Sequence, residues 1–287
     1  MYNKLMKSPA KNTVFLFALC FFFLFSACKT LPKMQEPVIS LDSIELAGID
    51  YTGVKLLCKV QIDNPNDFEI PYPQISWEAF IGKDSFTSGQ TSENSNIEAQ
   101  KTAIAEIPVS LEYLDIFNSF PLLKGTVQTD YRLDLALKFN IPELKNRVWN
   151  LQAEGIFPML KAPVIGASIM RVEKIDPSAV EWFVSVNLEN PNDFELPPPR
   201  HSFIYEINYT PFIRRTVTNR MPIAPSSSEP VIFGLLVYYV DVWRVFPELW
   251  VSGDIPSRLN LTFDFFIPAF SDDKFDLEIQ AELPRYQ

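Results

Sequence analysis

The chain has 287 residues, of which 47% are hydrophobic and 14% aromatic, and its formal net charge is −10. This length allows about two domains, and so much apolar sequence can bury their cores, which excludes a disordered chain. The acidic balance argues against a nucleic-acid partner, because phosphate binding needs a basic surface.

The N-terminal residues 1–27 have the pattern of a secretory signal: lysines without acids, then an apolar run at 14–25, then small residues. The run is shorter than the ~20 residues that span a bilayer as a helix. Ser26, Ala27 and Cys28 resemble a bacterial lipobox, with Phe25 where Leu is usual. We therefore predict cleavage after residue 27, lipidation of Cys28 and a tether at 28–36.

Lipidation predicts the membrane as a partner and the bacterial cell envelope as the location. Lys29 stands where an Asp would retain a lipoprotein at the inner membrane, which favours the outer membrane, on its periplasmic side or its surface. Cys20 would leave with the signal and Cys28 would be acylated, so no intramolecular disulfide is expected. Cys58 alternates with apolar neighbours and is predicted to be a buried thiol.

The rest of the chain is one segment repeated. Residues 37–158 recur at 163–287, and matching residues are always 126 positions apart. The sequence NPNDFE at 64–69, for example, is unchanged at 190–195. A constant offset from end to end predicts a duplicated domain rather than two unrelated turns. The linker 159–162 is short and apolar, which predicts packing between the copies. We call 37–158 the first copy and 163–287 the second copy.

Both copies alternate apolar and polar residues with a period of two, as at Leu56, Cys58, Val60 and Ile62. This pattern is typical of strands with one buried face, and the Pro, Asn and Asp turns between them favour a sandwich. Residues 111–120 instead have helical spacing, and Pro121 would end that helix, as Pro247 would in the second copy. We expect an all-β protein with one short helix per domain, as two tandem immunoglobulin/fibronectin-III-like antiparallel β-sandwiches of about seven strands each.

A repeated motif follows a strand in each copy: Asn64, Pro65 and Asn66, then Asn190, Pro191 and Asn192. Asn can hydrogen-bond its own backbone and Pro fixes φ, so we interpret the motif as a rigid structural turn. The alternative is a metal site at Asn66, Asp67 and Glu69, but these offer few oxygen ligands. We expect no metal.

The stretches 63–71 and 189–197 are similar to the late embryogenesis abundant type 2 domain, also called the water stress and hypersensitive response (WHy) domain. The resemblance rests on a strand that ends in Asn-Pro-Asn, followed by an apolar residue and Ile/Leu-Pro. It implies a β-sandwich with one short helix and a non-enzymatic role in desiccation and stress tolerance. It supplies no catalytic residue and no cofactor.

No catalytic constellation is visible in the sequence. His201 is the only histidine, so a histidine metal cluster is excluded and a catalytic triad would have to use it. We place His201 at a surface turn or strand start. No glycine-rich phosphate loop is present. We expect no enzyme and no cofactor.

Two functions remain open. The first is a stress-protective lipoprotein of the envelope. The second is a binding module that recognises a partner protein or an apolar or lipid ligand through the second copy, which is locally more basic and aromatic around Tyr209, Phe212 and Arg220. An ordinary solvated strand pair would also explain this composition. Trp250 is singled out because Lys124 stands at its matching position. The candidate partner contacts are Arg200, His201, Arg214, Arg215 and Trp250.

Overall fold

The computed structural model describes residues 33–145, 147–250 and 255–285. Most of these residues lie in antiparallel strands, with short helical segments between some of them. The strands of the first copy are β1 (Val38–Ile49), β2 (Gly53–Asp63), β3 (Ile70–Pro71), β4 (Gln74–Ile81), β5 (Asp84–Thr91), β6 (Asn96–Ile97), β7 (Thr102–Glu112), β8 (Gln128–Lys138) and β9 (Val148–Pro158). Its helical segments are α2 (Tyr113–Ser119) and the 3₁₀ turns η1 (Pro121–Leu123) and η2 (Pro142–Leu144).

The second copy repeats this order. Its strands are β10 (Val164–Ile175), β11 (Ala179–Asn190), β12 (Arg200–Ile207), β13 (Thr210–Thr218), β14 (Ser227–Tyr238), β15 (Ile255–Asp264) and β16 (Phe275–Leu283). Its helical segments are α3 (Tyr239–Val245), η3 (Pro247–Trp250) and η4 (Pro268–Phe270). β10, α3 and η4 lie 126 residues after β1, α2 and η2, so the repeat in the sequence is also a repeat of elements.

Each copy contains a three-stranded and a four-stranded sheet. The orders are β1-β2-β7 with β5-β4-β8-β9, and β10-β11-β14 with β13-β12-β15-β16. The two-residue strands β3 and β6 pair in the first copy, and a single bridge between Leu196 and Ile223 replaces that pair in the second. Within the described ranges, strands pair only with strands of their own copy.

Alternation of side chains creates the core. On β2, the side chains of Leu56, Cys58 and Val60 are buried. Lys55, which points to the opposite face of the strand, is exposed. In the second copy, Phe203 of one sheet stacks on Phe233 of the other at 5.0 Å between ring centroids, so the buried faces of the two sheets meet. The expectation of an all-β fold with a short helix in each copy is confirmed.

The helix lies where the spacing predicts it, but with a different buried face. Leu111 still belongs to β7, where it is buried, and β7 ends at Glu112. The helix α2 begins only at Tyr113. Tyr113, Ile116 and Phe117 are buried, whereas Leu114 is 36% exposed. The strand therefore continues two residues into the predicted helix. Pro121 then begins η1 and prevents α2 from continuing.

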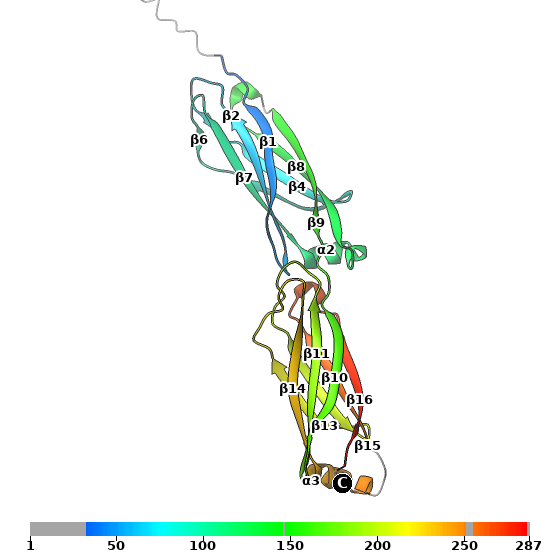
Figure 1. Ribbon diagram of the computed structural model, residues 1–287. Coiled ribbons are helices and arrows are strands. Elements are labelled where there is room, and N and C mark those ends of the chain that lie inside the picture. Colours follow the sequence, from blue (N-terminus) through cyan, green and yellow to red (C-terminus); the bar gives the residue numbers. More distant parts are fainter. Residues whose placement is uncertain (1–32, 146, 251–254, 286–287) are drawn as a thin grey trace, which may run out of the picture.

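The two copies lie end to end, with α2 of the first copy beside the near end of the second (Figure 1). Phe117 of α2 contacts Phe270 of η4, with 5.9 Å between ring centroids. The Lys124 ammonium lies 2.8 Å from Asp273 Oδ1 and 5.1 Å from the centre of the Phe270 ring. The linker residues Met159 and Leu160 are buried. The copies therefore pack on each other, as the short apolar linker predicts.

Candidate functional site

The Asn-Pro-Asn motif of the first copy holds the chain that enters the domain. Asn64 Nδ2 faces three backbone oxygens, those of Phe68 (2.9 Å), Ile97 (3.1 Å) and Glu98 (2.9 Å). Asn66 binds Gln35 twice: its Oδ1 accepts from Gln35 N (2.7 Å) and its Nδ2 donates to Gln35 O (2.9 Å). The motif thus closes its own turn and fixes the preceding segment. We call Asn66 with Gln35 the first clamp.

The second copy contains the same arrangement on the linker. Asn190 Nδ2 faces the backbone oxygens of Phe194, Ile223 and Ala224 at 2.7, 3.2 and 3.0 Å. Lys161 N donates to Asn192 Oδ1 at 2.9 Å, and Asn192 Nδ2 donates to Lys161 O at 2.9 Å. We call Asn192 with Lys161 the second clamp. All four asparagines of the two motifs are buried. The side-chain amides of Asn66 and Asn192 each pair with the backbone N–H and C=O of one residue, as a residue of a neighbouring strand would.

A tyrosine fixes the opposite end of each copy. Tyr113 Oη donates to Pro158 O at 2.8 Å, and Tyr239 Oη donates to Pro284 O at 2.8 Å. Burial raises the pKa of both phenols above the ordinary value, which keeps them protonated as donors. Each copy therefore holds its incoming chain with an asparagine and its outgoing chain with a tyrosine.

The one cysteine in the described part of the chain lies in the core. Cys58 is fully buried on β2, and burial raises the pKa of its thiol to about 11. Among the described residues, no group of three or more His, Cys, Asp and Glu side chains could hold a metal ion. The side-chain oxygens of Asn66 and Asn64 accept hydrogen bonds from backbone N–H groups, and the role of the motif as a structural turn stays a prediction.

The prediction that His201 lies at the surface is wrong, although it does lie near the start of β12. His201 is 1% exposed and stacks on Phe233 and Phe263, at 5.3 and 5.8 Å between ring centroids. Neither ring nitrogen has a hydrogen-bond partner within the described ranges. Burial lowers its pKa, because the charged imidazolium is disfavoured in an aromatic core. The matching residue in the first copy is Ile75, which is also buried.

The three arginines among the candidate partner contacts are exposed but do not form one surface. Arg200 is paired with Asp264 at 2.7 Å. Arg214 lies opposite Ile204 and Arg215 opposite Phe203 across the β12–β13 pair. Residues directly opposite in an antiparallel pair share a face, so Arg214 and Arg215 point to opposite faces of this edge. Their role as partner contacts stays a prediction.

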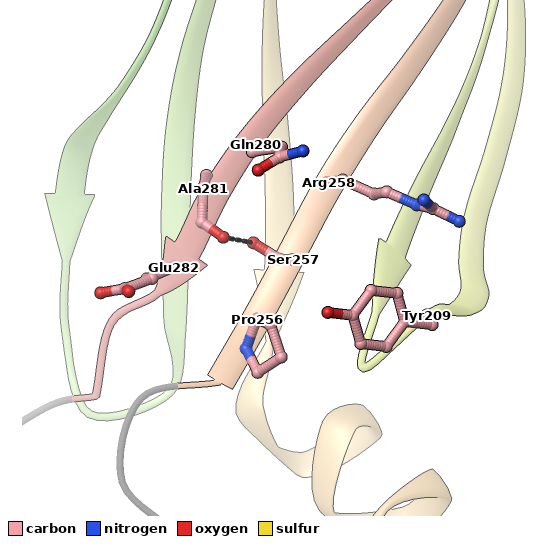
Figure 2. A pocket seen from close by; sticks show the side chains of 7 residues that line it. All are labelled: Tyr209, Pro256, Ser257, Arg258, Gln280, Ala281 and Glu282. Atoms are coloured by element: carbon pink, nitrogen blue, oxygen red, sulfur yellow. Dashed lines mark hydrogen bonds between the residues drawn. The ribbon is translucent and has the colours of Figure 1, made fainter.

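A polar groove of about 500 Å³ lies at the end of the β12-β15-β16 face of the second copy. Figure 2 shows Tyr209 and Arg258 on one side and Gln280 and Glu282 on β16. Glu206, Arg258 and Gln280 are direct cross-strand neighbours and form a polar row across three strands. Arg258 binds Glu206 through Nε, and its Cζ lies 5.6 Å from the centre of the Tyr209 ring. We call this the Tyr209 groove.

Two predicted sites cannot be placed. Cys28 and the signal at 1–27 lie outside the described residues, as does the side chain of Trp250, whose backbone ends η3. Within the described part of the chain, no helix is both long and apolar enough to cross a bilayer.

Several residues of these sites are not apparent in the sequence. Gln35 binds Asn66, and Lys161 binds Asn192, through backbone N–H and C=O groups, so these bonds give no signal in the residue types. Glu206 and Arg258 are 52 positions apart and meet through the β12–β15 register. Comparison of matching positions could have found Glu206, because Phe80 stands at the matching position, whereas Arg258 matches Arg132.

Residues 59–155 match the model of a family described as Late embryogenesis abundant protein, LEA_2. The chain is 26% identical over 112 residues to the Desiccation-related protein At2g46140 of Arabidopsis thaliana, covering 39% of this chain and 68% of that protein. It is 23% identical over 123 residues to the Desiccation protectant protein Lea14 homolog of Glycine max, covering 43% and 81%. The solution structure of AT1g01470 from Arabidopsis thaliana is 21% identical, with a TM-score of 0.35 and coverage of 46% and 88%.

Proposed function

Because residues 59–155 form a domain of the late embryogenesis abundant type 2 family, we propose that the chain is a non-enzymatic, stress-protective lipoprotein of the bacterial cell envelope. The observation that carries the proposal is the similarity of this segment to relatives named for desiccation. The burial of Cys58 and of His201 supports the absence of enzymatic activity, since neither group can reach a substrate from the core.

The domain assignment is part of the same proposal. We infer a signal peptide at 1–27, a tether at 28–36, a first sandwich at 37–158, a linker at 159–162 and a second sandwich at 163–287, both immunoglobulin/fibronectin-III-like. The clamps support these limits, since Asn66 and Asn192 hold the chain just before each copy begins. The recurrence of elements supports a type 2 domain in the second copy as well.

Protection is tested by drying a reporter enzyme with the purified protein and measuring its activity after rehydration. The control is an equal mass of albumin, which measures protection by any folded protein. We expect the protein to preserve clearly more activity than albumin does. Recovery that is no better than with albumin would contradict the proposed role.

The lipid anchor is tested separately with Cys28→Ser. The wild-type chain should incorporate a labelled fatty acid and sediment with the outer membrane, and the variant should do neither. A matched control is Cys58→Ser, which removes a thiol that burial protects and should leave labelling unchanged. A wild-type chain without label would reject the lipoprotein assignment and leave the drying result untouched.

A second candidate function, binding of an envelope protein by the second copy, has one observation of its own. Ile232 and Leu236 on the outer face of β14 are 58% and 44% exposed, while the matching residues of the first copy are Glu106 and Ser110. At these two outer positions, the second copy is therefore apolar where the first copy is polar. Exposed apolar faces are typical of protein contacts.

This candidate is tested with a photo-crosslinking residue at position 232 or 214. The matched controls are positions 106 and 88 of the first copy, which occupy the same places on the repeated fold. A discrete adduct from the second copy alone would support specific binding. No adduct, or equal adducts from both copies, would reject it.

A further inference from the structure

The Tyr209 groove is built on the outer face of the four-stranded sheet of the second copy. On this face, Glu206 lies opposite Arg258, and Arg258 lies opposite Gln280. Arg258 also approaches Glu278 at 3.6 Å, and Gln280 Nε2 donates to Glu278 Oε1 at 3.1 Å. The row thus presents hydrogen-bond donors and acceptors side by side, held in place by one another.

Tyr209 is held over this row by an unusual turn. Asn208 and Tyr209 are the two loop residues between β12 and β13, with φ values of 47° and 62°. Two positive φ values in a two-residue hairpin are the pattern of a type I′ turn, whose second position favours Gly. A bulky residue there is strained, and strain of this kind concentrates at functional sites. The Tyr209 side chain is nevertheless 72% exposed, so core packing does not explain it.

The ion pair beneath the ring contributes little stability of its own. Glu206 is 8% exposed although it points away from the core, because Arg258 covers its carboxylate. Burying a carboxylate loses its hydration, and a buried ion pair is often no more stabilising than apolar residues of the same size. The first copy shows that alternative, since Arg132 there lies over the Phe80 ring at 4.0 Å.

The rest of the groove also differs between the copies. Lys83 of the first copy stands where Tyr209 is, and Ile156 where Glu282 is. The matching hairpin of the first copy, between β4 and β5, has Gly82 and Lys83 as its two loop residues. Only Gly82 has a positive φ, which is the pattern of an unstrained type II′ turn. The second copy therefore has a strained aromatic residue in the turn and a Glu206–Arg258 ion pair, where the first copy has a relaxed turn and a contact between Arg132 and the Phe80 ring.

We propose that the Tyr209 groove binds a neutral oligosaccharide. The Tyr209 ring offers a flat apolar surface to the C–H face of a pyranose, and Arg258, Gln280 and Glu282 offer donors and acceptors to its hydroxyls. Glu206, Glu278 and Glu282 against one Arg258 disfavour an anionic ligand. The polar walls disfavour an apolar ligand, and one ring is too few for the aromatic cage of a quaternary ammonium.

The test is saturation-transfer NMR with the full chain, purified in a detergent without a sugar headgroup. The probes are cellohexaose, maltohexaose and the hexamer of N-acetylglucosamine at millimolar concentration, with a heparin hexasaccharide as the anionic comparison. We expect transfer to at least one neutral hexasaccharide and none to heparin. Titration of that sugar should then show about tenfold weaker binding for Tyr209→Ala.

Two variants separate loss of the site from loss of the fold. Tyr209→Gly removes the ring while suiting the turn, so it should lose binding and yet raise the melting temperature. Lys83→Ala removes the matching side chain of the first copy and should bind as the wild type does. The proposal is overturned if no neutral hexasaccharide receives transfer, if heparin alone does, or if Tyr209→Gly binds like the wild type. None of these results depends on the drying or lipidation experiments.

Discussion

Asn192 and Lys161 form a closed pair of hydrogen bonds at the junction between the copies, each 2.9 Å long. Lys161 uses its backbone N–H and C=O, and Asn192 uses both ends of its side-chain amide. The linker is therefore held as if it were a strand residue beside a neighbour. Met159 and Leu160, just before Lys161, are buried. Three successive residues of the linker are therefore fixed, two by packing and one by hydrogen bonds.

Asn192→Ala is expected to destabilise the second copy. The backbone groups of Lys161 lose their partners, and Asn190 Oδ1 loses the Asn192 side chain as a donor. Unpaired buried groups cost about 1–3 kcal/mol each, so we expect a loss of about 2–4 kcal/mol in the free energy of unfolding, measured in urea. Asn66→Ala breaks the same bonds to Gln35 and should cost as much without loosening the junction. Equal stability of wild type and Asn192→Ala would contradict this account.

The second copy should lose stability in acid through His201. Burial lowers the folded pKa of His201 below its ordinary value of 6.5, so in acid the unfolded state binds a proton more readily than the folded state. Stability is therefore fully present at about pH 8, well above 6.5, and is lower at about pH 5, because the unfolded state takes up the proton between these two pH values. Denaturation of wild type and His201→Ile at both pH values measures this, since Ile75 shows that the fold accepts isoleucine there. An identical pH dependence in the variant would exclude His201 as the cause.

Cys58 should be inert in the folded protein. Its thiol is fully buried and its pKa is raised to about 11, so little thiolate exists at pH 8 and none is accessible. Peptide mapping after iodoacetamide treatment should find Cys58 unmodified in buffer and fully modified in concentrated urea. Rapid alkylation of Cys58 in buffer would mean that the first copy opens locally far more readily than its packing implies.

Tyr209→Gly should stabilise the protein even though it removes a large side chain. Relief of a strained positive φ contributes about 1 kcal/mol, which raises the melting temperature of a chain of this size by about 2–4 °C. Lys83→Gly is the control: Lys83 has no positive φ, so glycine there should add flexibility and lower the melting temperature slightly. A lower melting temperature for Tyr209→Gly would mean that the ring contributes to the fold.

Phe270→Ala should loosen the contact between the copies. Its ring lies against Phe117 and beneath the Lys124 ammonium. Lys124 and Asp273 are both about a third exposed, so their ion pair contributes at most about 1 kcal/mol and cannot replace the ring. Distances between spin labels on the two copies should become more widely distributed. Leu144→Ala changes the matching residue of η2 and should leave that distribution narrow.

Periodicity and the repeat predict most of the fold. The alternation through Cys58 and Val60 identifies β2, and the proline at 121 identifies the end of α2. The start of α2 is missed because Leu111 fits both a strand and a helical spacing, and pairing with Val54 of β2 decides between them. Local pattern cannot show such a competition, since the partner strand is distant in the sequence.

The sites are predicted less completely than the fold. The Asn-Pro-Asn motif is visible, but its second asparagine binds Gln35 or Lys161 at backbone atoms, which the sequence does not distinguish. His201 follows three prolines and an arginine, a polar context that suggests a surface, yet strand alternation from Arg200 places it inside. The sequence shows Tyr209 only as one member of a basic and aromatic stretch, and the φ value of its turn is needed to single it out.

The two kinds of tie have a mechanical consequence. The clamps hold the incoming chain of each copy, and the tyrosine bonds to Pro158 and Pro284 hold the outgoing chain. A pull applied between Gln35 and Pro284 would therefore act along the long axis in Figure 1 and load the ties at both ends of each copy. The strand ladders would share that load with the ties, and the buried Met159 and Leu160 would pass it from one copy to the other.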